Sequence, residues 1–406
     1  MNKAFDAQLL LPPSEALERY FAAVTLAPPR LERVAIDDAF GRILGQPVEA
    51  DGDYPNAPRS AMDGFAVRAA STPGTLRLAG GTPIASTPEC DIEAGGAMRV
   101  PTGGVLPRGA DAVVPIESAR CERDLVRVDE RVAAGDSVTP RGADMRAGES
   151  VLEKGRRIGA PEMGLLAALG IVDVPVYRRP VVAVLSSGDE LIVPSQRPRA
   201  GEVRDSNRYA LAGSLRALGA QPRHYPIVRD REGALEAALA QALDECDAAI
   251  VSGGSSVGDR DLTPAAVTAL GTPGVVVHGL RVRPGKPTLL AALGEKPVLG
   301  LPGNPLSALV MLEAVAAPIL AALVGAAPPS VEFDARLAEA LHGRPGWTWY
   351  VPVRIAQGAA HPLPMRSFSS SLAARASGYV RVGDERHEYP AGASVRVRRF
   401  FAGGFL

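Results

Sequence analysis

The segment 247–305 constrains the fold most strongly, because it alternates short apolar runs with glycine-rich and proline-rich turns. Residues 247–251 form an apolar run of the kind found in buried parallel strands. This run leads directly into the loop 252–261, whose glycines and serines offer backbone N–H groups to an anion. Thr263 and Pro264 then predict the N-cap and the first residue of a helix. The pattern therefore predicts a strand, an anion-binding loop and a helix in succession.

The same pattern returns at residues 301–305, where Asn304 can cap and Pro305 can open the apolar helix 306–316. Between the two turns, the segment 281–287 holds three cations in a loop braced by prolines. Two helix N-termini, a cationic loop and nearby carboxylates indicate a site for anions together with a divalent metal. Any one turn taken alone is better explained by a simple connection in a doubly wound sheet, because short motifs often match by chance. The three features together favour a binding site.

Length, charge and cysteine content limit the class of protein. At 406 residues the chain is too long for one ordinary core and should form several domains. Its 44 basic and 45 acidic residues leave a net charge of -1, so no overall field attracts nucleic acid or an anionic membrane. Three widely separated cysteines exclude a disulfide framework and indicate a reducing compartment. We recognise no signal peptide and no apolar span of membrane length, so we expect a cytoplasmic protein.

The remaining chain predicts a multidomain fold of the α/β and β classes. Helical spacing begins at Pro13 and continues in one or two turns over 36–44. From Val181, strands and helices alternate, which predicts a doubly wound, mostly parallel sheet with helices on both faces. The expected domains are a discontinuous helical and extended dimerisation domain (1–44 and 149–178), an inserted β-rich domain (45–148), an α/β domain (179–326) and a C-terminal β-barrel (327–406).

Acidic residues follow the strands of the expected α/β sheet. Within it we expect strands at 181–185 and 224–228, in addition to the strand before loop 252–261. In such sheets ligands bind beyond the carboxyl ends of the strands. The acids of these turns, which we expect to converge on that edge, include Glu190, Asp230, Asp259 and Asp261.

Seven short motifs occur in order along the chain, at 60–64 (Ser-Ala-Met-Asp-Gly), 141–144 (Arg-Gly-Ala-Asp), 188–191 (Gly-Asp-Glu-Leu), 205–207 (Asp-Ser-Asn), 252–261, 284–287 (Pro-Gly-Lys-Pro) and 301–305 (Leu-Pro-Gly-Asn-Pro). In this order they resemble the molybdopterin molybdenumtransferases of the MoeA type, which include the C-terminal domain of gephyrin. The resemblance implies an elongated homodimer, in which the molybdopterin-binding α/β domain of one subunit faces the β-rich domain of the other. It also implies that molybdate is inserted into adenylylated molybdopterin with release of AMP, assisted by Mg²⁺. Other molybdenum cofactor assembly proteins would be its partners.

The resemblance assigns roles residue by residue. It implies the catalytic acids Asp63, Asp144, Glu190, Asp230 and Asp261, and the metal ligands Glu190, Asp259 and Asp261. The residues implied in binding cofactor and substrate are Ser252, Gly253, Gly254, Ser256, Gly258, Arg283, Lys286, Pro302, Gly303, Asn304, Pro305, Ser307 and Arg344. This chain departs from the family at Arg283 and at His278, where lysine is usual. Arginine keeps the charge but presents it as a planar fork.

Two alternatives stay open at this point. A molybdopterin adenylyltransferase shares the α/β domain but needs neither segment 45–148 nor segment 330–406. A non-catalytic dimeric scaffold needs a groove for a partner but no intact set of acids. Taken alone, Asp63 is better explained by a β-turn and Asp144 by a solvated loop. The two extra segments and the retained acids nevertheless favour the transferase.

Overall fold

The structure is a computed structural model that describes residues 10–84, 86–88, 90–253, 262–365, 370–383 and 386–401. The chain forms two compact units, each with a hydrophobic core of its own. Unit 1 comprises Met1–Gly45, Gly155–Met163 and Val172–Leu406, and unit 2 comprises Gln46–Lys154 and Gly164–Ile171.

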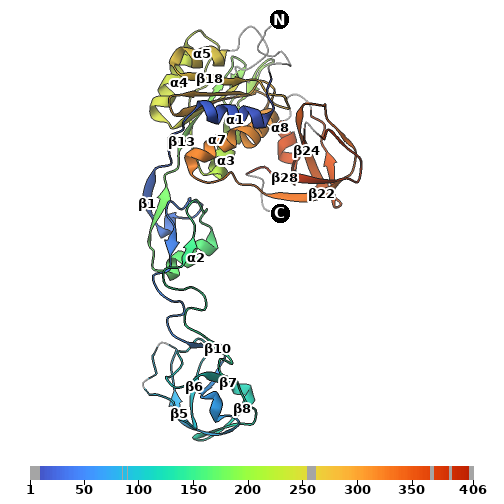
Figure 1. Ribbon diagram of the computed structural model, residues 1–406. Helices are drawn as coiled ribbons and strands as arrows, with labels where there is room; N and C mark the ends of the chain where they lie inside the picture. The colour runs from blue at the N-terminus through green and yellow to red at the C-terminus, as the bar shows by residue number, and fades with distance from the viewer. Residues whose placement is uncertain are drawn as a thin grey trace. The chain divides into compact units, whose positions relative to one another are not determined.

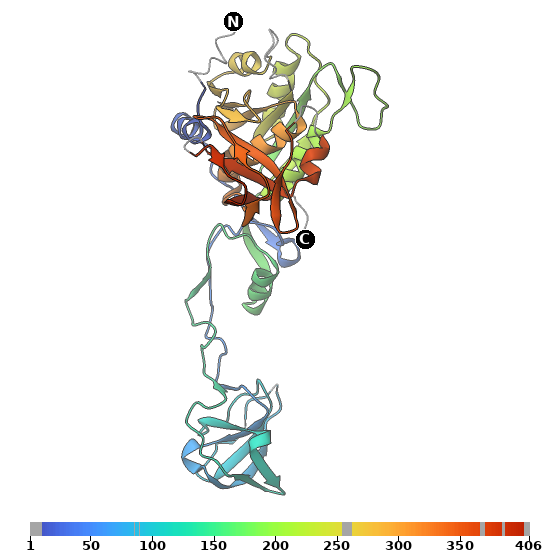
Figure 2. The ribbon, with the colours of Figure 1, turned by 90° about the vertical axis from the view of Figure 1, so that its right-hand side faces the viewer.

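Unit 2 is β-rich, as the alternating pattern of residues 45–148 predicts. Its strands are β2 (Val48–Glu49), β3 (Arg59–Ser60), β4 (Gly64–Val67), β5 (Gly74–Gly81), β6 (Gly96–Val100), β7 (Ala112–Pro115), β8 (Ala119–Glu122), β9 (Leu125–Val128), β10 (Val138–Thr139) and β11 (Ser150–Leu152). Six of them form a sheet in the order β7-β4-β6-β5-β9-β8, drawn in blue and cyan in Figure 2. Phe65 and Val67 of β4 join one core and Ala66 joins another, because successive residues of a strand point to opposite faces.

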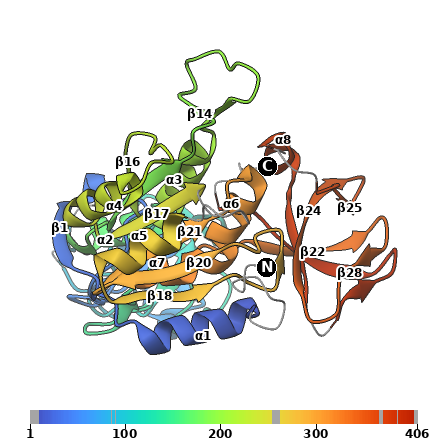
Figure 3. The same ribbon diagram turned by 90° about the horizontal axis from the view of Figure 1, so that it is seen from above.

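Unit 1 contains the expected α/β sheet, in the strand order β16-β13-β17-β21-β20-β18. These strands are β13 (Val181–Ser187), β16 (Gln221–His224), β17 (Ala248–Gly253), β18 (Pro273–His278), β20 (Leu289–Leu293) and β21 (Lys296–Leu301). The first four strands in the sheet order run parallel, whereas β20 and β18 pair antiparallel at the other edge. Strands β14 (Leu191–Ile192) and β15 (Val203–Arg204) pair beyond the sheet and carry a projecting loop (Figure 3).

Helices cover both faces of this sheet (Figure 1). They are α1 (Pro13–Ala23), α3 (Asn207–Leu218), α4 (Ala234–Glu245), α5 (Leu262–Leu270), α6 (Pro305–Met311) and α7 (Ala317–Val324). Val182 and Val184 of β13 pack in one core with α1, α3, α6 and α7, while Ala183 and Leu185 pack in another with α4 and α5. The doubly wound arrangement therefore follows from strand residues that are apolar toward both faces.

A closed barrel follows the α/β layers in unit 1 (Figure 3). Its elements are β22 (Glu332–Leu337), β24 (Thr348–Ala356), β25 (Ala359–Pro362), β26 (Gly378–Val382) and β28 (Ser394–Arg398), with β23 (Leu341–His342), β27 (Glu388–Tyr389) and α8 (Ser370–Arg375) beside them. Pairing of β24 with β26 closes the five strands. A sixth strand, β19 (Val282–Arg283), joins the barrel by pairing in parallel with β24. The cationic loop is thereby attached to the barrel.

The rest of the described chain forms short elements. Strand β1 (Leu31–Ala35) pairs with β12 (Asp173–Tyr177), and α2 (Ala160–Ala168) contributes residues to both units. The helix predicted over 36–44 is wrong, since only Ile36–Asp38 form a 3₁₀ turn. Ile43 and Leu44 instead form β-bridges, which a continuing helix would preclude.

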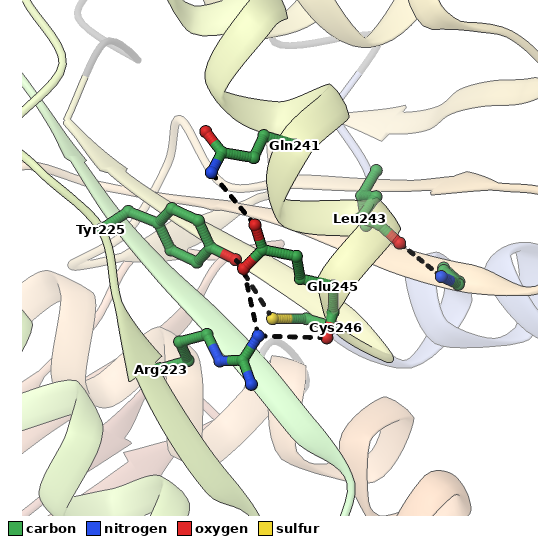
Figure 4. A network of polar contacts seen from close by, with 7 residues as sticks. Arg223, Tyr225, Gln241, Leu243, Glu245 and Cys246 are labelled. Atoms are coloured by element: carbon green, nitrogen blue, oxygen red, sulfur yellow. Dashed lines mark hydrogen bonds and ion pairs between the residues drawn. The ribbon is translucent and has the colours of Figure 1, made fainter.

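The strand predicted at 224–228 is also misplaced, because the structure has β16 at Gln221–His224. Pro226 lacks the N–H group that a sheet ladder needs, so the apolar residues after His224 do not extend the strand. A polar network holds this edge against α4 (Figure 4). The Glu245 carboxylate accepts hydrogen bonds from Arg223 at 3.1 Å, from the Tyr225 hydroxyl at 2.9 Å and from Gln241 at 3.0 Å.

The apolar helix predicted over 306–316 continues to Val324. Its first part is α6, its middle a π-helical stretch (Leu312–Ala316) and its last part α7. Pro318 cannot donate a backbone hydrogen bond, and the π-helical stretch accommodates this interruption of the ladder. Pro305–Val324 is long and apolar enough to cross a membrane, and 78% of its apolar window is buried inside the protein. The prediction that the chain has no such span is therefore wrong, and packing on all sides explains the composition.

Candidate functional site

A cationic pocket lies where β19 meets the barrel. Its volume is about 410 Å³, and it is lined by residues 282–287 together with Arg344, Trp347 and Trp349. Arg283 ends β19, Lys286 lies in the loop between β19 and β20, and Arg344 comes from the turn before β24. The structure therefore brings together three cations that the sequence places in two distant segments.

The backbone of the cationic loop is tightly constrained. Gly285 has a φ of +112°, and a Cβ atom built on it would lie 2.3 Å from Cγ and Sδ of Met311 in α6. The Thr288 hydroxyl donates to the Gly285 carbonyl at 2.6 Å, and the Leu280 N–H donates to the Lys286 carbonyl at 2.8 Å. Only glycine fits this close contact with α6. The loop therefore presents its cations from a fixed backbone.

Both arginines of the pocket lie over tryptophan rings. The Arg283 Cζ atom is 4.5 Å from the ring centroid of Trp349, and the Arg344 Cζ atom is 5.1 Å from that of Trp347. Arg283 and Arg344 are exposed and Lys286 is half-buried. None of the described residues that line the pocket is acidic. Such a pocket suits an oxyanion, because charged donors form short, strong hydrogen bonds to anionic oxygens.

The second part of the site is the carboxyl edge of the α/β sheet, where the end of β17 lies beside the end of β21. Ser252 pairs in register with Leu301, and Gly253 pairs with Ser187 of β13. Gly253 has a φ of +92°, and a Cβ atom on it would lie 2.2 Å from the Ser187 carbonyl oxygen. Its own Cα lies 3.6 Å from the position that a Cβ atom on Gly303 would take. The end of β17 and the turn after β21 therefore pack directly against each other at Gly253 and Gly303.

A buried side chain that the sequence reasoning did not assign to the site joins the end of β17 to the turn after β21. Asn207, at the start of α3, donates from Nδ2 to the Ser252 hydroxyl at 2.7 Å and to the Gly303 carbonyl at 2.9 Å. Its place in the Asp-Ser-Asn motif is the signal that could have identified it. Asn207 therefore links the end of β17 to the turn that precedes α6.

The helix start predicted at Asn304 and Pro305 is confirmed. Pro305 is the first residue of α6, and Asn304 is its N-cap. The Asn304 Oδ1 atom accepts hydrogen bonds from the backbone N–H and from the hydroxyl of Ser307, each at 3.3 Å. Pro302, before the cap, is buried. The cap satisfies one of the backbone N–H groups that a helix start leaves without partners.

The turns that carry Glu190 and Asp230 lie together at the same edge. Asp230 accepts a hydrogen bond from the Ser187 hydroxyl at 3.2 Å, and its backbone N–H donates to Asp189 Oδ1 at 3.1 Å. Arg229 donates hydrogen bonds to the carbonyl oxygens of Gly188, Asp189 and Leu191, at 2.9 Å for Asp189. Glu190 itself is exposed. The convergence expected for these two turns is thus seen in the structure.

The other predicted acids lie either in unit 2 or outside the described residues. Asp63 and Asp144 are exposed residues of unit 2, and Asp63 Oδ1 accepts from the Thr102 N–H at 2.7 Å. The predicted site residues Gly254, Ser256, Gly258, Asp259 and Asp261 lie outside the described residues. Within the described ranges, no three His, Cys, Asp or Glu side chains gather as a metal site.

The prediction that Thr263 caps the start of a helix is wrong, because the helix starts earlier. Helix α5 begins at Leu262, so Thr263 lies inside the first turn instead of at the N-cap. Its side chain is fully buried, and its Cγ2 atom lies 3.5 Å from the position of a Cβ atom built on Gly300 of β21. Thr263 was expected to be the N-cap, but its side chain packs against the sheet from within the first turn of the helix.

The doubly wound domain, the capped helix start at its sheet edge and the cationic pocket are features that suit a multidomain protein with anionic ligands. Two protein-family models match the chain. Residues 11–170 match the MoeA N-terminal region (domain I and II), and residues 183–322 match the probable molybdopterin binding domain.

Similar proteins carry the same description over most of the chain. A molybdopterin molybdenumtransferase from Nostoc sp. is 37% identical over 299 residues, which is 71% of this chain and 68% of the relative. One from Bacillus subtilis is 30% identical over 383 residues, 90% of this chain and 89% of the relative. The crystal structure of a molybdopterin biosynthesis MoeA protein from Pyrococcus horikoshii has a TM-score of 0.81 at 30% identity, covering 96% of this chain and 99% of that chain.

The chain belongs to the MoeA family of molybdopterin molybdenumtransferases, which act in molybdenum cofactor biosynthesis. Membership implies molybdate and molybdopterin-related compounds as substrates. The predicted fold class is confirmed by the structural match. The match to the N-terminal region also counts against the adenylyltransferase alternative, which has no need of that region.

Proposed function

We propose that this chain inserts molybdate into adenylylated molybdopterin and releases AMP. The observation that supports this most directly is the pocket shared by Arg283, Lys286 and Arg344, whose described lining holds no acid. Molybdate is a dianion with oxygens on every side, so it suits cations and N–H donors and is repelled by carboxylates. The three cations bind and orient molybdate in this proposal.

The adenylylated pterin binds at the sheet edge in the same proposal. Turns that expose backbone N–H groups at a helix start favour phosphate groups. The residues assigned to this role are Ser252, Gly253, Gly254, Ser256, Gly258, Pro302, Gly303, Asn304, Pro305 and Ser307. Asn207 acts indirectly, because its hydrogen bonds hold Ser252, at the end of β17, to Gly303 in the turn before α6.

Acids and Mg²⁺ serve the cleavage that releases AMP. Mg²⁺ usually binds proteins through one or two carboxylates, together with substrate phosphates and water. The exposed Glu190 fits such a ligand, and Asp259 and Asp261 complete the proposed set. When bound, Mg²⁺ neutralises charge on the phosphate and on the leaving group. Asp63, Asp144 and Asp230 are proposed as further catalytic acids, and the hydrogen bond from Ser187 keeps Asp230 oriented.

Equilibrium dialysis with molybdate tests the pocket assignment. We expect Arg283→Ala and Lys286→Ala to weaken binding about 10- to 100-fold, as is typical for a lost hydrogen bond to a charged group. Arg354→Ala is a matched control, because Arg354 is an exposed arginine of β24 that does not line the pocket. Thermal melts should show that all three variants stay folded. Molybdate affinity unchanged in both pocket variants would refute the assignment.

We also propose a cytoplasmic homodimer that exchanges substrates with other cofactor-assembly proteins. The proposed domains are 1–44 with 149–178, 45–148, 179–326 and 327–406. Asp63 belongs to a different unit from Glu190, which is why we expect one active site to draw on two chains. Mixing inactive Asp63→Ala and Glu190→Ala proteins should then restore part of the activity through heterodimers. If subunit exchange is demonstrated and the mixture stays inactive, the shared-site proposal fails.

A further inference from the structure

The chain contains 2 tryptophans, and both line the cationic pocket. Neither was assigned a role from the sequence. Trp347 and Trp349 are half-buried, so each ring has one part in the protein and another at the pocket surface. Each carries an arginine guanidinium over its ring. The same arginine–tryptophan pairing occurs twice in one pocket, so the pocket is formed by the rings as well as by the charges.

The pairing of Arg283 with Trp349 is built into the strands. These two residues are direct partners in the parallel register of β19 and β24. The Thr348 N–H donates to the Arg281 carbonyl at 2.9 Å, which fixes that register one residue earlier. With both Cα atoms held by the ladder, the guanidinium lies over the ring at 4.5 Å. The backbone register therefore places the two side chains next to each other, within reach of this contact.

The pairing of Arg344 with Trp347 is fixed by a turn. The Trp347 N–H donates to the Arg344 carbonyl at 3.0 Å, which brings residues three apart onto the same side of the turn. The guanidinium then lies 5.1 Å from the ring centroid. Both arginines of the pocket are thus oriented by an aromatic neighbour from the barrel.

An arginine side chain loses considerable rotamer freedom when it is ordered by a ligand. A guanidinium that already rests on an indole ring has lost part of this freedom before the ligand arrives. Its in-plane N–H groups stay available to an oxyanion while its face contacts the ring. A lysine ammonium, the usual group of the family at Arg283, is a point charge and gains no fixed orientation from such stacking.

We propose that Trp349 and Trp347 are positioning residues for molybdate, which hold Arg283 and Arg344 in the orientation that the dianion requires. This inference rests on the proposed function of the pocket. The tryptophans touch neither molybdate nor the pterin in this account. They act through the arginines, so the benefit of each ring disappears when its arginine is removed.

Equilibrium dialysis with radiolabelled molybdate tests this on the full-length protein. A cation–π contact contributes about 0.5–2 kcal/mol, so Trp349→Leu should weaken molybdate binding about 2- to 30-fold. Trp349→Phe retains an aromatic face and should recover most of the affinity. In an Arg283→Ala background, Trp349→Leu should cause no further loss, because the two residues act as one unit.

Tyr389→Leu is the matched control. Tyr389 lies beneath Arg386 at 4.4 Å, on the same barrel but outside the cationic pocket. It should lower the melting temperature about as much as Trp349→Leu does and leave molybdate affinity unchanged. A second measurement needs no variant of the rings: saturating molybdate should change the tryptophan fluorescence of the unmodified protein, and Arg283→Ala should abolish the change.

The outcomes separate this inference from the function on which it rests. Normal molybdate binding by Trp349→Leu, or an equal further loss in the Arg283→Ala background, would overturn the positioning role alone. If Trp349→Leu does not fold, unchanged fluorescence of the unmodified protein at saturating molybdate counts against the role. Failure of the unmodified protein to bind molybdate, or full binding by Arg283→Ala, would refute the pocket assignment and the inference together.

Discussion

A buried carboxyl group in the π-helical stretch makes the stability of unit 1 depend on pH. Glu313 is only 1% exposed, and its Oε1 atom accepts from the Ser214 hydroxyl at 2.9 Å and from the Phe401 N–H at 3.1 Å. Burial raises the pKa of Glu313 from 4.5 to about 7, while these two hydrogen bonds and the nearby Arg398 act in the opposite direction. The charged form is thus the disfavoured form in the folded protein.

The sign and size of the effect follow from this shift. Between pH 4.5 and about 7 the folded state binds more protons than the unfolded state, so the free energy of unfolding falls as the pH rises through this window. Its contribution is fully present below pH 4.5 and lost above about pH 7. Each pH unit corresponds to about 1.4 kcal/mol, which gives a total loss of about 3 kcal/mol. Glu313→Gln keeps the Oε1 acceptor and cannot ionise, so it should lack this loss.

The assay is a series of thermal melts at pH 5, 6, 7 and 8 for the unmodified protein and Glu313→Gln. We expect the variant to gain stability relative to the unmodified protein with each step from pH 5 to 7, and to hold that gain at pH 8. Glu339→Gln, at an exposed position, is the control and should follow the unmodified protein. Parallel pH profiles for the unmodified protein and Glu313→Gln would refute the reasoning.

Three further predictions concern the sheet edge and its helix starts. Gly253→Ala should lower the melting temperature sharply, since its Cβ would lie 2.2 Å from the Ser187 carbonyl, whereas Gly135→Ala, with a similar φ of +93° and open space, should cost much less. Asn304→Ala should remove about 1 kcal/mol of stability by loss of the helix cap, and a melt that does not change would show the cap to be irrelevant. Asp261→Asn should slow AMP release by orders of magnitude in a single-turnover assay while the adenylylated pterin still binds, and near-normal release would reduce Asp261 to a structural role.

The fold of the α/β domain could be predicted because its local signals agree with its tertiary packing. The strands β13 and β17 are buried on both faces, so their sequences are continuous apolar runs. Asn304 and Pro305 start a helix for reasons that lie within four residues. The cationic loop could be recognised for the same reason, because its prolines, glycine and charges are adjacent in the chain.

Features that depend on long-range pairing could not be predicted. The register between β19 and β24 joins residues far apart in the sequence, so the two tryptophans were not foreseen, and Arg344 was assigned to the site only through the family resemblance. Thr263 has the composition of a cap, but contact with the sheet places it inside α5. Strand β16 was misplaced because Pro226 interrupts the pairing with β13, which returns only as an isolated bridge between Val228 and Ser187. In the first two cases a tertiary contact outweighs the local preference.

The central claim is that molybdate bound in the cationic pocket enables the release of AMP from adenylylated molybdopterin. The most direct measurement is single-turnover AMP release with Mg²⁺, in the presence and absence of molybdate. We predict that one AMP is released per bound adenylylated pterin when molybdate is present, that little is released without it, and that Arg283→Ala requires far more molybdate for the same rate. AMP release at the same rate without molybdate, or none with saturating molybdate, would contradict the account.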